Sequence, residues 1–455
     1  MTRRPPSRAP RIRAIVGIAL VCAIAMSPLS CGREVAHRRV ILIGIDGASP
    51  LVAFPMMDDG LLPNLSAIAR EGVHGPLRSV LPLYSPRIWN TIATGRPAGQ
   101  HGVTAFVKPS KDAEKKLFLS HDRRVPALWN IVSAQGLSVG VVNWWTTYPP
   151  ERINGTMVSD HFFPEQISMI KRTFKDARSS SGSLVHPESW QARAESLRAE
   201  SGPKTRVGDP FAAHDGALLP HWVNREILSG QYQTDASVVR IALGLQADQH
   251  PDVMMVFLPG IDRVSHWLWG NLEPAGKYPP TLQPSDSERA AGAAALRLYY
   301  EYTDELIGLL TRDYGPDDLV MVISDHGFEA GESLMLLTGV HDTPAALDGV
   351  LFARGRGIEA GGGVGPVSVY DVAPSLLAWL GVPTAANMPG RPADFLHLEA
   401  PLRIASYDGI AIERAPDTAS GHEDEIVEHL RSLGYLEAED EAATRAASDP
   451  EPDAR

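Results

Sequence analysis

Short, continuously apolar runs alternate with amphipathic stretches along most of this chain of 455 residues. Residues 40–45 form the clearest apolar run, and residues 137–142, 253–258, 319–323 and 350–353 resemble further buried strands. A strand that is apolar at every position is typical of a sheet that is covered on both faces. The pattern therefore predicts an α/β fold, with a largely parallel central sheet and helices on both of its faces.

The segments between these runs carry the spacing of helices. Apolar positions three and four residues apart predict helices over residues 63–70, 126–135, 289–310 and 371–380. Gly381 and Pro383 follow the last of these segments and are typical stop signals. Residues 89–94 resemble the first turns of a further helix, with Ser85 and Pro86 at or just before its start.

Two segments depart from this alternation. Residues 164–216 are rich in Ser, Arg, Glu and Lys and have little strand character, so we expect a helical insertion over about residues 161–250 or a lid. Beyond residue 399 the apolar density falls, and residues 425–436 predict one amphipathic helix before a disordered acidic tail at 437–455. The expected main domain spans residues 38–398, and residues 399–455 form the C-terminal helix and tail.

The first 31 residues have the composition of an export signal. Five arginines and no acidic residue precede the apolar run at 14–26, which is too short to span a bilayer comfortably. The sequence Ser30-Cys31-Gly32 resembles a bacterial lipoprotein cleavage site, where Cys31 carries the lipid. We expect an exported bacterial protein, either periplasmic or attached to the membrane through Cys31, and an uncleaved N-terminal anchor is the alternative.

Composition and charge exclude several classes of protein. Apolar residues at 44% and charged residues at 21% are typical of a globular chain. The net charge of −12 disfavours binding to a nucleic-acid duplex, because phosphates attract basic surfaces. The two cysteines, Cys22 and Cys31, both lie in or beside the signal, so a disulfide-stapled scaffold and thiolate metal ligands are excluded from the folded part if Cys31 is lipidated.

Candidate metal ligands stand after or between the predicted strands. Ligand sites in open α/β sheets lie at the carboxyl ends of the strands, where loops carry polar side chains above a rigid frame. Oxygen and imidazole donors without thiolate suit Zn²⁺ or Mn²⁺. The candidates are three aspartates and three histidines: Asp46, Asp262, His266, Asp325, His326 and His341.

Ser85 is the candidate nucleophile. It stands at the expected start of a helix, where unpaired N–H groups and the positive end of the helix dipole favour a phosphate and an alkoxide. The alternative interpretation is that Ser85 only caps the helix, which serine does often.

Together and in this order, the motifs resemble the type I phosphodiesterase/nucleotide pyrophosphatase family of the alkaline phosphatase superfamily. The resemblance covers about residues 38–395 and implies an alkaline-phosphatase-like fold. It rests on Gly-Ile-Asp46-Gly, Ser85-Pro, Thr94-Gly95, His101-Gly102, Asp262-Arg-Val-Ser-His266, Asp325-His326-Gly-Phe and Gly-Val-His341. The segment from Trp144 to Asp160 also resembles the family, although the sequence assigns it no chemical role.

The resemblance implies two metal sites and a nucleophile. One site uses Asp262, His266 and His341, and the other uses Asp46, Asp325 and His326, with Ser85 beside the second. At one position the chain differs, because the family has Asn three residues after the nucleophile and this chain has Ile88. Arg87 and Asn90 are the polar neighbours that could hold a phosphate oxygen instead. The order Ser85-Pro86-Arg87 also lacks the spacing of the sulfatase motif.

These features favour a metal-dependent hydrolase of phosphate diesters or nucleotide pyrophosphates that works through a phosphoserine intermediate. Two divalent ions about 4 Å apart, Zn²⁺ or Mn²⁺ here, stabilise the entering and leaving oxygens of such a displacement. One alternative is a phosphomonoesterase or phosphonate hydrolase on the same site. From another class, a non-catalytic envelope binding protein is the remaining alternative. The sequence does not indicate an oligomeric state.

Overall fold

The computed structural model describes residues 1–2, 38–109, 116–163, 182–200, 202–209, 211, 228–274, 276–278, 285–331, 338–398, 401–414, 423 and 427. The chain divides into two units, Met1–His37 and Arg38–Arg455, and every element below belongs to the second. Apart from residues 1 and 2, the predicted export signal with Cys31 lies outside the described residues. So does the predicted C-terminal helix, apart from residue 427, and so does the acidic tail.

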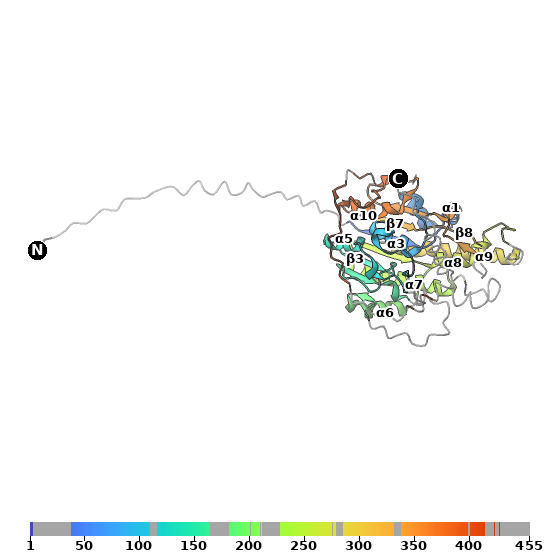
Figure 1. Cartoon of the computed structure of the whole chain (residues 1–455), viewed down its shortest axis with the longest axis horizontal. Helices are drawn as coiled ribbons and strands as arrows, with labels where there is room; N and C mark the ends of the chain where they lie inside the picture. The colour runs from blue at the N-terminus through green and yellow to red at the C-terminus, as the bar shows by residue number, and fades with distance from the viewer. Residues whose placement is uncertain are drawn as a thin grey trace. The chain divides into compact units, whose positions relative to one another are not determined.

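A ten-stranded sheet runs through the middle of the second unit (Figure 1). The order of its strands is β11-β2-β10-β7-β1-β6-β3-β4-β5, with β12 beside β2. The five central strands run parallel to one another, as the apolar runs predict. They are β7 (Leu319–Ser324), β1 (Val40–Ile45), β6 (Val253–Leu258), β3 (Val139–Val142) and β4 (Gly155–Val158).

Outside these five strands the sheet is mixed. β10 (Asp348–Arg354) runs antiparallel to β7 and to β2 (Val73–Arg78), and β5 (Val185–His186) runs antiparallel to β4. β11 (Gly362–Gly363) and β12 (Val367–Ser368) lie parallel to β2. Two further pairs lie outside this sheet: β8 (Glu329–Ala330) with β9 (Gly339–Val340), and β13 (Thr384–Ala385) with β14 (Arg403–Ile404).

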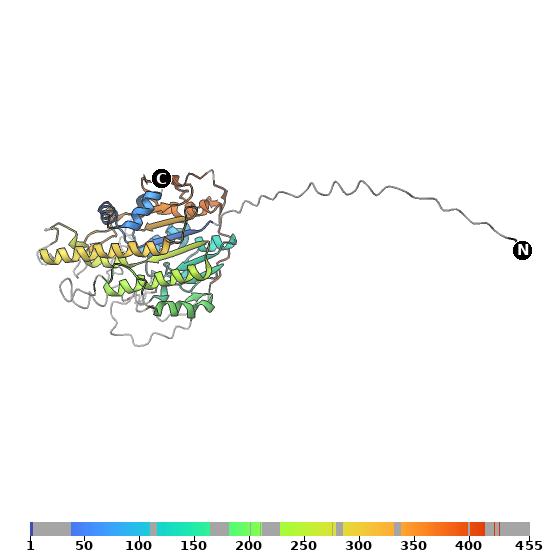
Figure 2. The same ribbon diagram turned by 180° about the vertical axis from the view of Figure 1, so that it is seen from behind.

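Successive residues of the central strands face two different apolar cores. In β1, Ile41 and Ile43 belong to one core, while Val40 and Leu42 belong to the other. The first core lies under α7 (Ser229–Gln249) and α9 (Asp286–Thr311), which lie side by side in Figure 2. The second includes residues of α3 (Ser85–Thr94), α5 (Leu128–Ala134) and α10 (Val372–Trp379). The predicted α/β fold with helices on both faces is confirmed.

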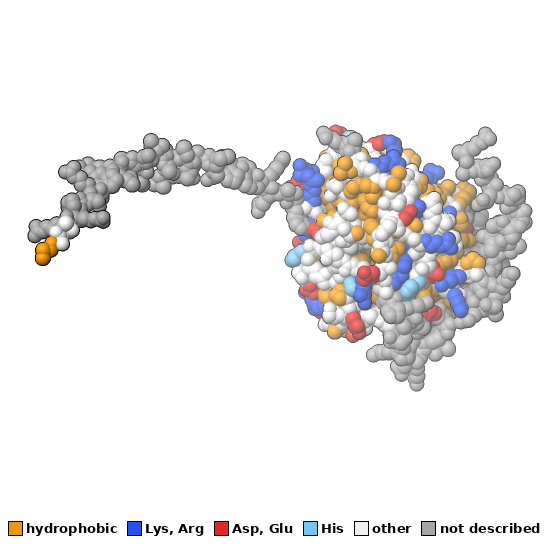
Figure 3. All heavy atoms as spheres, turned by 60° about the vertical axis from the view of Figure 1, so that its left-hand side comes forward, with side chains coloured by type: hydrophobic (Ala, Val, Ile, Leu, Met, Phe, Trp, Pro, Cys, Tyr) orange, Lys and Arg blue, Asp and Glu red, His pale blue; other side chains and the backbone are white. Residues whose placement is uncertain are grey.

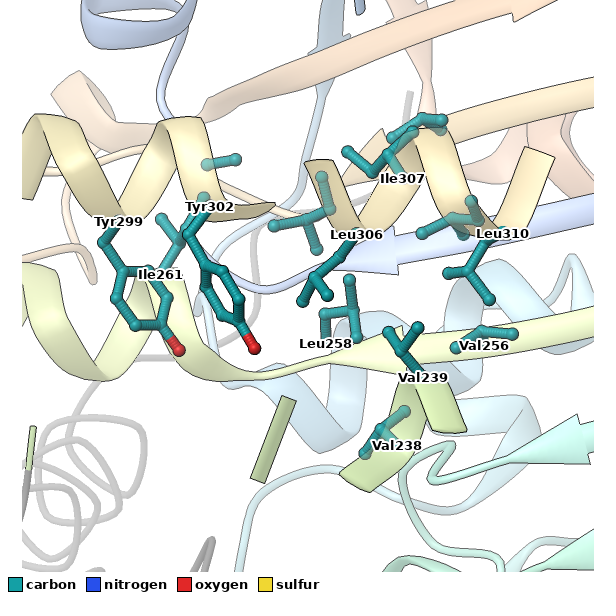
Figure 4. Packing of buried hydrophobic residues seen from close by; sticks show 14 of the residues in the cluster. Val238, Val239, Val256, Leu258, Ile261, Tyr299, Tyr302, Leu306, Ile307 and Leu310 are labelled. Atoms are coloured by element: carbon teal, nitrogen blue, oxygen red, sulfur yellow. The ribbon is translucent and has the colours of Figure 1, made fainter. Parts of the chain in front are cut away.

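The contact between α7, α9 and β6 is apolar throughout its centre. Figure 4 shows Val238 and Val239 of α7 and Leu306 of α9 packed around Val256 and Leu258 of β6. All five side chains are fully buried. Hydrophobic burial at this contact fixes the helices on the strand whose carboxyl end begins the site described below.

The remaining helices are short. They are α1 (Pro50–Asp58), α2 (Pro63–Glu71), α4 (Ala98–His101), α6 (Gln191–Ala199) and α8 (Gly260–Leu268). Within the predicted insertion, the described residues form β5, α6 and α7, and α7 packs against β6 and β3 of the central sheet. The boundaries of the insertion stay a prediction.

The predicted helices at 63–70, 126–135, 289–310 and 371–380 correspond to α2, α5, α9 and α10. Among the elements that the sequence analysis did not predict are α1, β2 and β4, which lack a local signal. Helix α1 holds Pro55 inside it, and strand β2 holds Gly75 and Pro76, which are residues that usually end such elements. Tertiary pairing with β10 on one side and β11 and β12 on the other overrides this local preference in β2.

No helix in the described part of the chain has the length and apolar composition needed to cross a bilayer. On the face shown in Figure 3, acidic and basic side chains of the described residues are interspersed with apolar and uncharged ones. The expectation that no nucleic-acid duplex binds stays a prediction.

Trp89 joins helix α3 to the sheet, and its removal is expected to be costly. Its side chain is fully buried and packs edge-to-face on Trp144 and Phe257, with ring centroids 5.1 and 5.0 Å away. A side chain at Gly44 would place its Cβ 2.6 Å from the Trp89 ring, so β1 makes room for the indole. We expect Trp89→Ala to lower the free energy of unfolding by about 3–5 kcal/mol, because it leaves a large cavity.

Urea denaturation measures this change, with Leu81→Ala as the control. Leu81 is 43% exposed, so its truncation is expected to change stability by less than about 0.5 kcal/mol. A loss in Trp89→Ala no larger than in the control would contradict the packing described for α3.

Candidate active site

The sequence-predicted residues lie where the central parallel strands end. Asp46 directly follows β1, and the pair Asp325-His326 directly follows β7. Asp262 and His266 lie on α8, which begins two residues after β6. Two further predicted residues complete the set: Ser85 is the first residue of α3, and His341 directly follows β9. Because parallel strands carry their carboxyl ends on one edge, the fold brings these residues to one place.

The side chains meet within a few ångströms. His326 Nε2 lies 3.5 Å from both Asp46 Oδ1 and Asp325 Oδ2 and 4.0 Å from Asp262 Oδ1. Asp262 Oδ1 in turn lies 3.6 Å from Nε2 of His266 and 3.6 Å from Nε2 of His341. None of the six is more than 4% exposed. The convergence that the sequence predicts is therefore present in the structure.

Ser85 lies beside this cluster. Its hydroxyl donates a hydrogen bond of 3.3 Å to Asp46 Oδ1, and the residue is 1% exposed. The loop before it is held by Asp342, whose Oδ1 accepts a hydrogen bond of 2.8 Å from the backbone N–H of Leu83. The loop that carries His341 is thus tied directly to the loop that presents Ser85.

Two overlapping groups of three residues could each hold a metal ion. They are Asp46 with Asp325 and His326, and Asp262 with His326 and His341. The first group is the predicted one. In the second, His326 stands where the sequence analysis placed His266. His326 belongs to both groups, and its ring stacks on the His341 ring with the two centroids 3.9 Å apart. His266 lies beside the second group, with its Nε2 3.6 Å from Asp262 Oδ1. Its assignment as a metal ligand stays a prediction.

Burial sets the protonation of the histidines. It lowers the pKa of His266 to about 4 and that of His326 to about 3, and it lowers the pKa of His341 well below its usual value. All three rings are therefore neutral at pH 7. Nδ1 of His266 lies 2.9 Å from the carbonyl oxygen of Gly339, and Nδ1 of His326 lies 3.0 Å from that of Gly327. When Nδ1 donates to these carbonyls, each Nε2 presents a lone pair toward the carboxylates.

The carboxylates oppose one another electrostatically. Burial, reinforced by the negative charge of Asp262, raises the pKa of Asp46 to about 7. Burial and the charge of Asp46 raise the pKa of Asp325 well above its usual value. Like charges this close and this buried are unfavourable unless a cation lies among them.

The donor atoms of the cluster fit divalent metal ions. Within the described residues, Asp325 Oδ2 and His326 Nε2 are buried and have no hydrogen-bond partner. Buried polar atoms nearly always have a partner. Two such atoms 3.5 Å apart fit a shared metal ion as that partner. Carboxylate oxygen and neutral imidazole nitrogen are both ligands of Zn²⁺ and Mn²⁺.

Backbone geometry holds the first aspartate in place. Gly47, directly after Asp46, has φ +69°, and its N–H donates a hydrogen bond of 3.3 Å to Asp325 Oδ1. A Cβ at this position would lie 2.6 Å from the Phe328 ring. Glycine is therefore required where the chain turns away from β1.

Helix α8 is fixed by the two long helices beside it. Asp235 of α7 accepts a hydrogen bond of 2.9 Å from the Tyr299 hydroxyl of α9, and a side chain at Gly260 would collide with both groups. Gly260 is the first residue of α8, so this contact sets the start of the helix that carries Asp262 and His266.

The two predicted substrate ligands make contacts within the chain. Arg87 Nη1 donates to the carbonyl oxygens of Val80 and Pro82, at 3.0 and 2.8 Å. Asn90 Nδ2 donates to the carbonyl of Pro86 at 2.7 Å and to the hydroxyl of Thr146. Both residues hold the backbone around Ser85, and their role in binding substrate stays a prediction.

Sequence reasoning missed Arg263, which lies inside the motif that supplied Asp262 and His266. Its side chain is 5% exposed and donates a hydrogen bond of 3.2 Å to Gln231 Oε1. Its positive charge opposes the rise in the pKa of Asp46 and adds to the fall in the pKa of His266. Arg263 therefore offsets part of the negative charge of the cluster. A buried arginine within a ligand motif is the signal that could have identified it.

Carboxylates and neutral imidazoles grouped beside a serine at a helix start are the groups that phosphoryl transfer uses. The model of one family, described as Type I phosphodiesterase / nucleotide pyrophosphatase, matches residues 40–362. The match covers more than half of the chain, and the protein belongs to this family. A search of curated proteins gave no match.

Several solved structures are similar to this chain at low sequence identity. Phosphonoacetate hydrolase from Sinorhizobium meliloti 1021 is 17% identical over 66% of this chain, with a TM-score of 0.41, and this chain covers 58% of its length. Phosphonate monoester hydrolase from Silicibacter pomeroyi is 16% identical, with 80% of this chain and 77% of that chain covered and a TM-score of 0.44. Human ectonucleotide pyrophosphatase / phosphodiesterase 5 is 11% identical, with 78% and 98% covered and a TM-score of 0.45.

Proposed function

We propose that this protein is a metal-dependent hydrolase of phosphate diesters or nucleotide pyrophosphates that uses Ser85 as its nucleophile. The observation that carries the proposal is the hydrogen bond of 3.3 Å from the Ser85 hydroxyl to Asp46, at the edge of the cluster of aspartates and histidines. One metal site would use Asp46, Asp325 and His326, and the other Asp262, His266 and His341. Zn²⁺ suits this donor set, and Mn²⁺ is the alternative.

The proposed reaction proceeds in two displacements at phosphorus. Ser85 Oγ attacks the phosphorus, the bond to the leaving alcohol or phosphate breaks, and the proton of Ser85 ends on that leaving group. The phosphoserine ester that forms keeps the other ester group of the substrate. A water molecule then attacks the same phosphorus, and Ser85 is released with its proton restored. When bound, two divalent ions supply charge neutralisation and lower the pKa of a hydroxyl or water that they contact. Two inversions give net retention of configuration.

The residues around Ser85 favour this chemistry. Ser85 begins α3, so the positive end of this helix dipole lies beside the reacting phosphate and stabilises its negative charge. Asp46 accepts the hydroxyl proton of Ser85 in a hydrogen bond and so orients its oxygen. The buried setting strengthens each of these interactions, because little water competes for them.

A panel of chromogenic esters tests the proposal. The expected result is that bis(4-nitrophenyl) phosphate has a kcat/KM at least about tenfold above that of 4-nitrophenyl phosphate and of a phenylphosphonate ester, and that chelation abolishes all three activities. A preference for the monoester or the phosphonate would contradict the proposal and would favour the alternative, a phosphomonoesterase or phosphonate hydrolase. Absence of turnover on every ester with metal bound would favour a non-catalytic binding protein.

Asp46→Asn is expected to remove the ion next to Ser85 and to leave the other. The metal content measured by elemental analysis after dialysis should fall from about two equivalents in the unchanged protein to about one. The reason is that the amide is a much weaker ligand than the carboxylate. Asp304→Asn is a matched control, since Asp304 is a buried carboxylate that accepts hydrogen bonds from Asn64 and Leu65 instead of facing the cluster. Unchanged occupancy in Asp46→Asn would refute that ligand assignment.

We also propose that the protein is exported in a bacterium and anchored to the envelope by a lipid on Cys31. The support is the run of arginines, the short apolar segment and the sequence Ser30-Cys31-Gly32. Labelling with a fatty-acid analogue should mark the protein and should fail to mark Cys31→Ser. Equal labelling of both would exclude Cys31 as the attachment point.

A further inference from the structure

The loop that follows β3 contains a strained residue close to the nucleophile helix. Thr146 has φ +56°, in the left-handed region. A β-branched residue is rarely found there, because its side chain crowds the backbone. Such strain persists only where the surrounding structure holds it, and it is concentrated at functional sites. β3 is one of the parallel strands, so this loop lies at the same edge of the sheet as the candidate active site.

Asp160 holds the strained conformation. Its Oδ2 accepts a hydrogen bond of 2.8 Å from the backbone N–H of Thr146. The next residue, Thr147, accepts a hydrogen bond of 3.0 Å from the backbone N–H of Asp160. Asp160 is 6% exposed and directly follows Ser159 at the end of β4. Asp160, just after β4, therefore holds the backbone N–H of Thr146 and the hydroxyl of Thr147.

The strain places one hydroxyl against helix α3. Thr146 Oγ1 accepts a hydrogen bond from Asn90 Nδ2, and the same amide nitrogen donates to the carbonyl oxygen of Pro86 at 2.7 Å. Pro86 is the residue directly after Ser85. Asn90 and Thr146 are almost fully buried, at 0% and 3% exposure. A second bond joins the same loop to the same helix, since Trp144 Nε1 donates to the carbonyl of Trp89 at 3.2 Å.

We propose that Thr146 is a positioning residue, which acts through the Asn90 amide to fix the first turn of α3 and with it the direction of the Ser85 hydroxyl. This inference rests on the proposed function, because it assigns Ser85 as the nucleophile. It gives a role to the segment from Trp144 to Asp160, which the sequence analysis singled out without one. It also explains why the backbone is strained at this position, because a relaxed loop would carry the hydroxyl away from Asn90.

Three substitutions separate positioning from plain structural support. Thr146→Val keeps the branched shape and removes the hydroxyl, and we expect kcat for the diester to fall about 10- to 100-fold with KM changed less than twofold. Thr146→Ser keeps the hydroxyl and should restore kcat to within about threefold. Thr146→Gly removes both the strain and the hydroxyl, so kcat should fall as in Thr146→Val while the melting temperature stays the same or rises.

His250→Gly is the matched control for release of strain. His250 is an exposed residue with φ +46° at the end of α7, before the amino end of β6 and thus at the opposite edge of the sheet. Its replacement by glycine should raise the melting temperature and leave kcat unchanged. Metal content, measured on every variant, should stay at the level of the unchanged protein, because Thr146 is outside both groups of candidate ligands.

A kcat in Thr146→Val or Thr146→Gly equal to that of the unchanged protein would overturn the inference. The inference would also fail if kcat and the melting temperature fell together in all three variants. That result is expected if Thr146 only supports the structure. Ser85→Ala in the same assay separates the two claims. If it is inactive while the Thr146 variants are fully active, the inference fails and the proposed function stands, and if it is fully active, the proposed function fails.

Discussion

Ser85→Ala is expected to lower kcat for a phosphate diester by about 10³-fold or more while both metal equivalents remain bound. The substitution removes only the oxygen that would form the phosphoserine ester, and it leaves the aspartates and histidines unchanged. Steady-state kinetics with a chromogenic diester and elemental analysis of the same sample measure the two quantities. Acid quenching of the unchanged enzyme during turnover, followed by mass spectrometry, should find the phosphoryl group, with its remaining ester, on the peptide that contains Ser85.

Ser133→Ala is the control for this experiment. Ser133 lies near the end of α5 and accepts a hydrogen bond of 3.0 Å from the backbone N–H of Asn154, at the amino end of β3 and away from the site. We expect its kcat to stay within about twofold of the unchanged enzyme. Full activity in Ser85→Ala would refute the phosphoserine route.

Asp325→Asn is expected to affect stability in opposite ways with and without metal. In the metal-free protein, burial and the neighbouring Asp46 raise the pKa of Asp325 above its unfolded value. The folded state then holds a proton that the unfolded state loses, so this carboxyl costs stability as the pH rises above its unfolded pKa. A neutral amide of the same shape removes that cost. With a chelator at pH 7.5, the melting temperature of the variant should therefore equal or exceed that of the unchanged protein.

Added Zn²⁺ should reverse the order. An ion at about 1,000 times its dissociation constant stabilises the folded state by about 4 kcal/mol for each site, and Asp325→Asn should lose most of this gain at one site together with its activity. Thermal unfolding with chelator and with Zn²⁺ measures both effects. Asp304→Asn should be destabilised alike in both conditions, because its carboxylate holds the backbone N–H groups of Asn64 and Leu65. The same behaviour in Asp325→Asn would contradict its assignment as a ligand.

The sequence predicts the centre of the fold well because its strands are buried on both faces. β1 and β6 are apolar at every position, and β7 is apolar at every position before Ser324. Runs of this kind are visible in the sequence alone. The polar residues that follow them, Asp46 and the pair Asp325-His326, then stand out by contrast. β2 escaped prediction because Gly75 and Pro76 interrupt it, and pairing with neighbours on both sides compensates.

Contacts between distant loops are the part that the sequence does not reveal. Nothing near Thr146 in the chain indicates that its hydroxyl meets Asn90, 56 positions earlier, or that Asp160 holds its backbone. Arg87 and Asn90 illustrate the same limit, since both are polar and close to Ser85 in sequence, yet their hydrogen bonds go to the backbone around it. Nor does the sequence indicate that His326 belongs to both groups of candidate ligands, with its ring stacked on that of His341.

Anomalous diffraction at the zinc edge, from crystals grown with Zn²⁺, would locate the metal ions directly. Two peaks are expected about 4 Å apart beside Ser85, one of them at about 2.0–2.2 Å from ligand atoms of Asp46, Asp325 and His326. The second peak should have Asp262, His266 and His341 at the same distances. No peak at these side chains, or zinc bound only elsewhere on the protein, would contradict the proposed pair of metal sites.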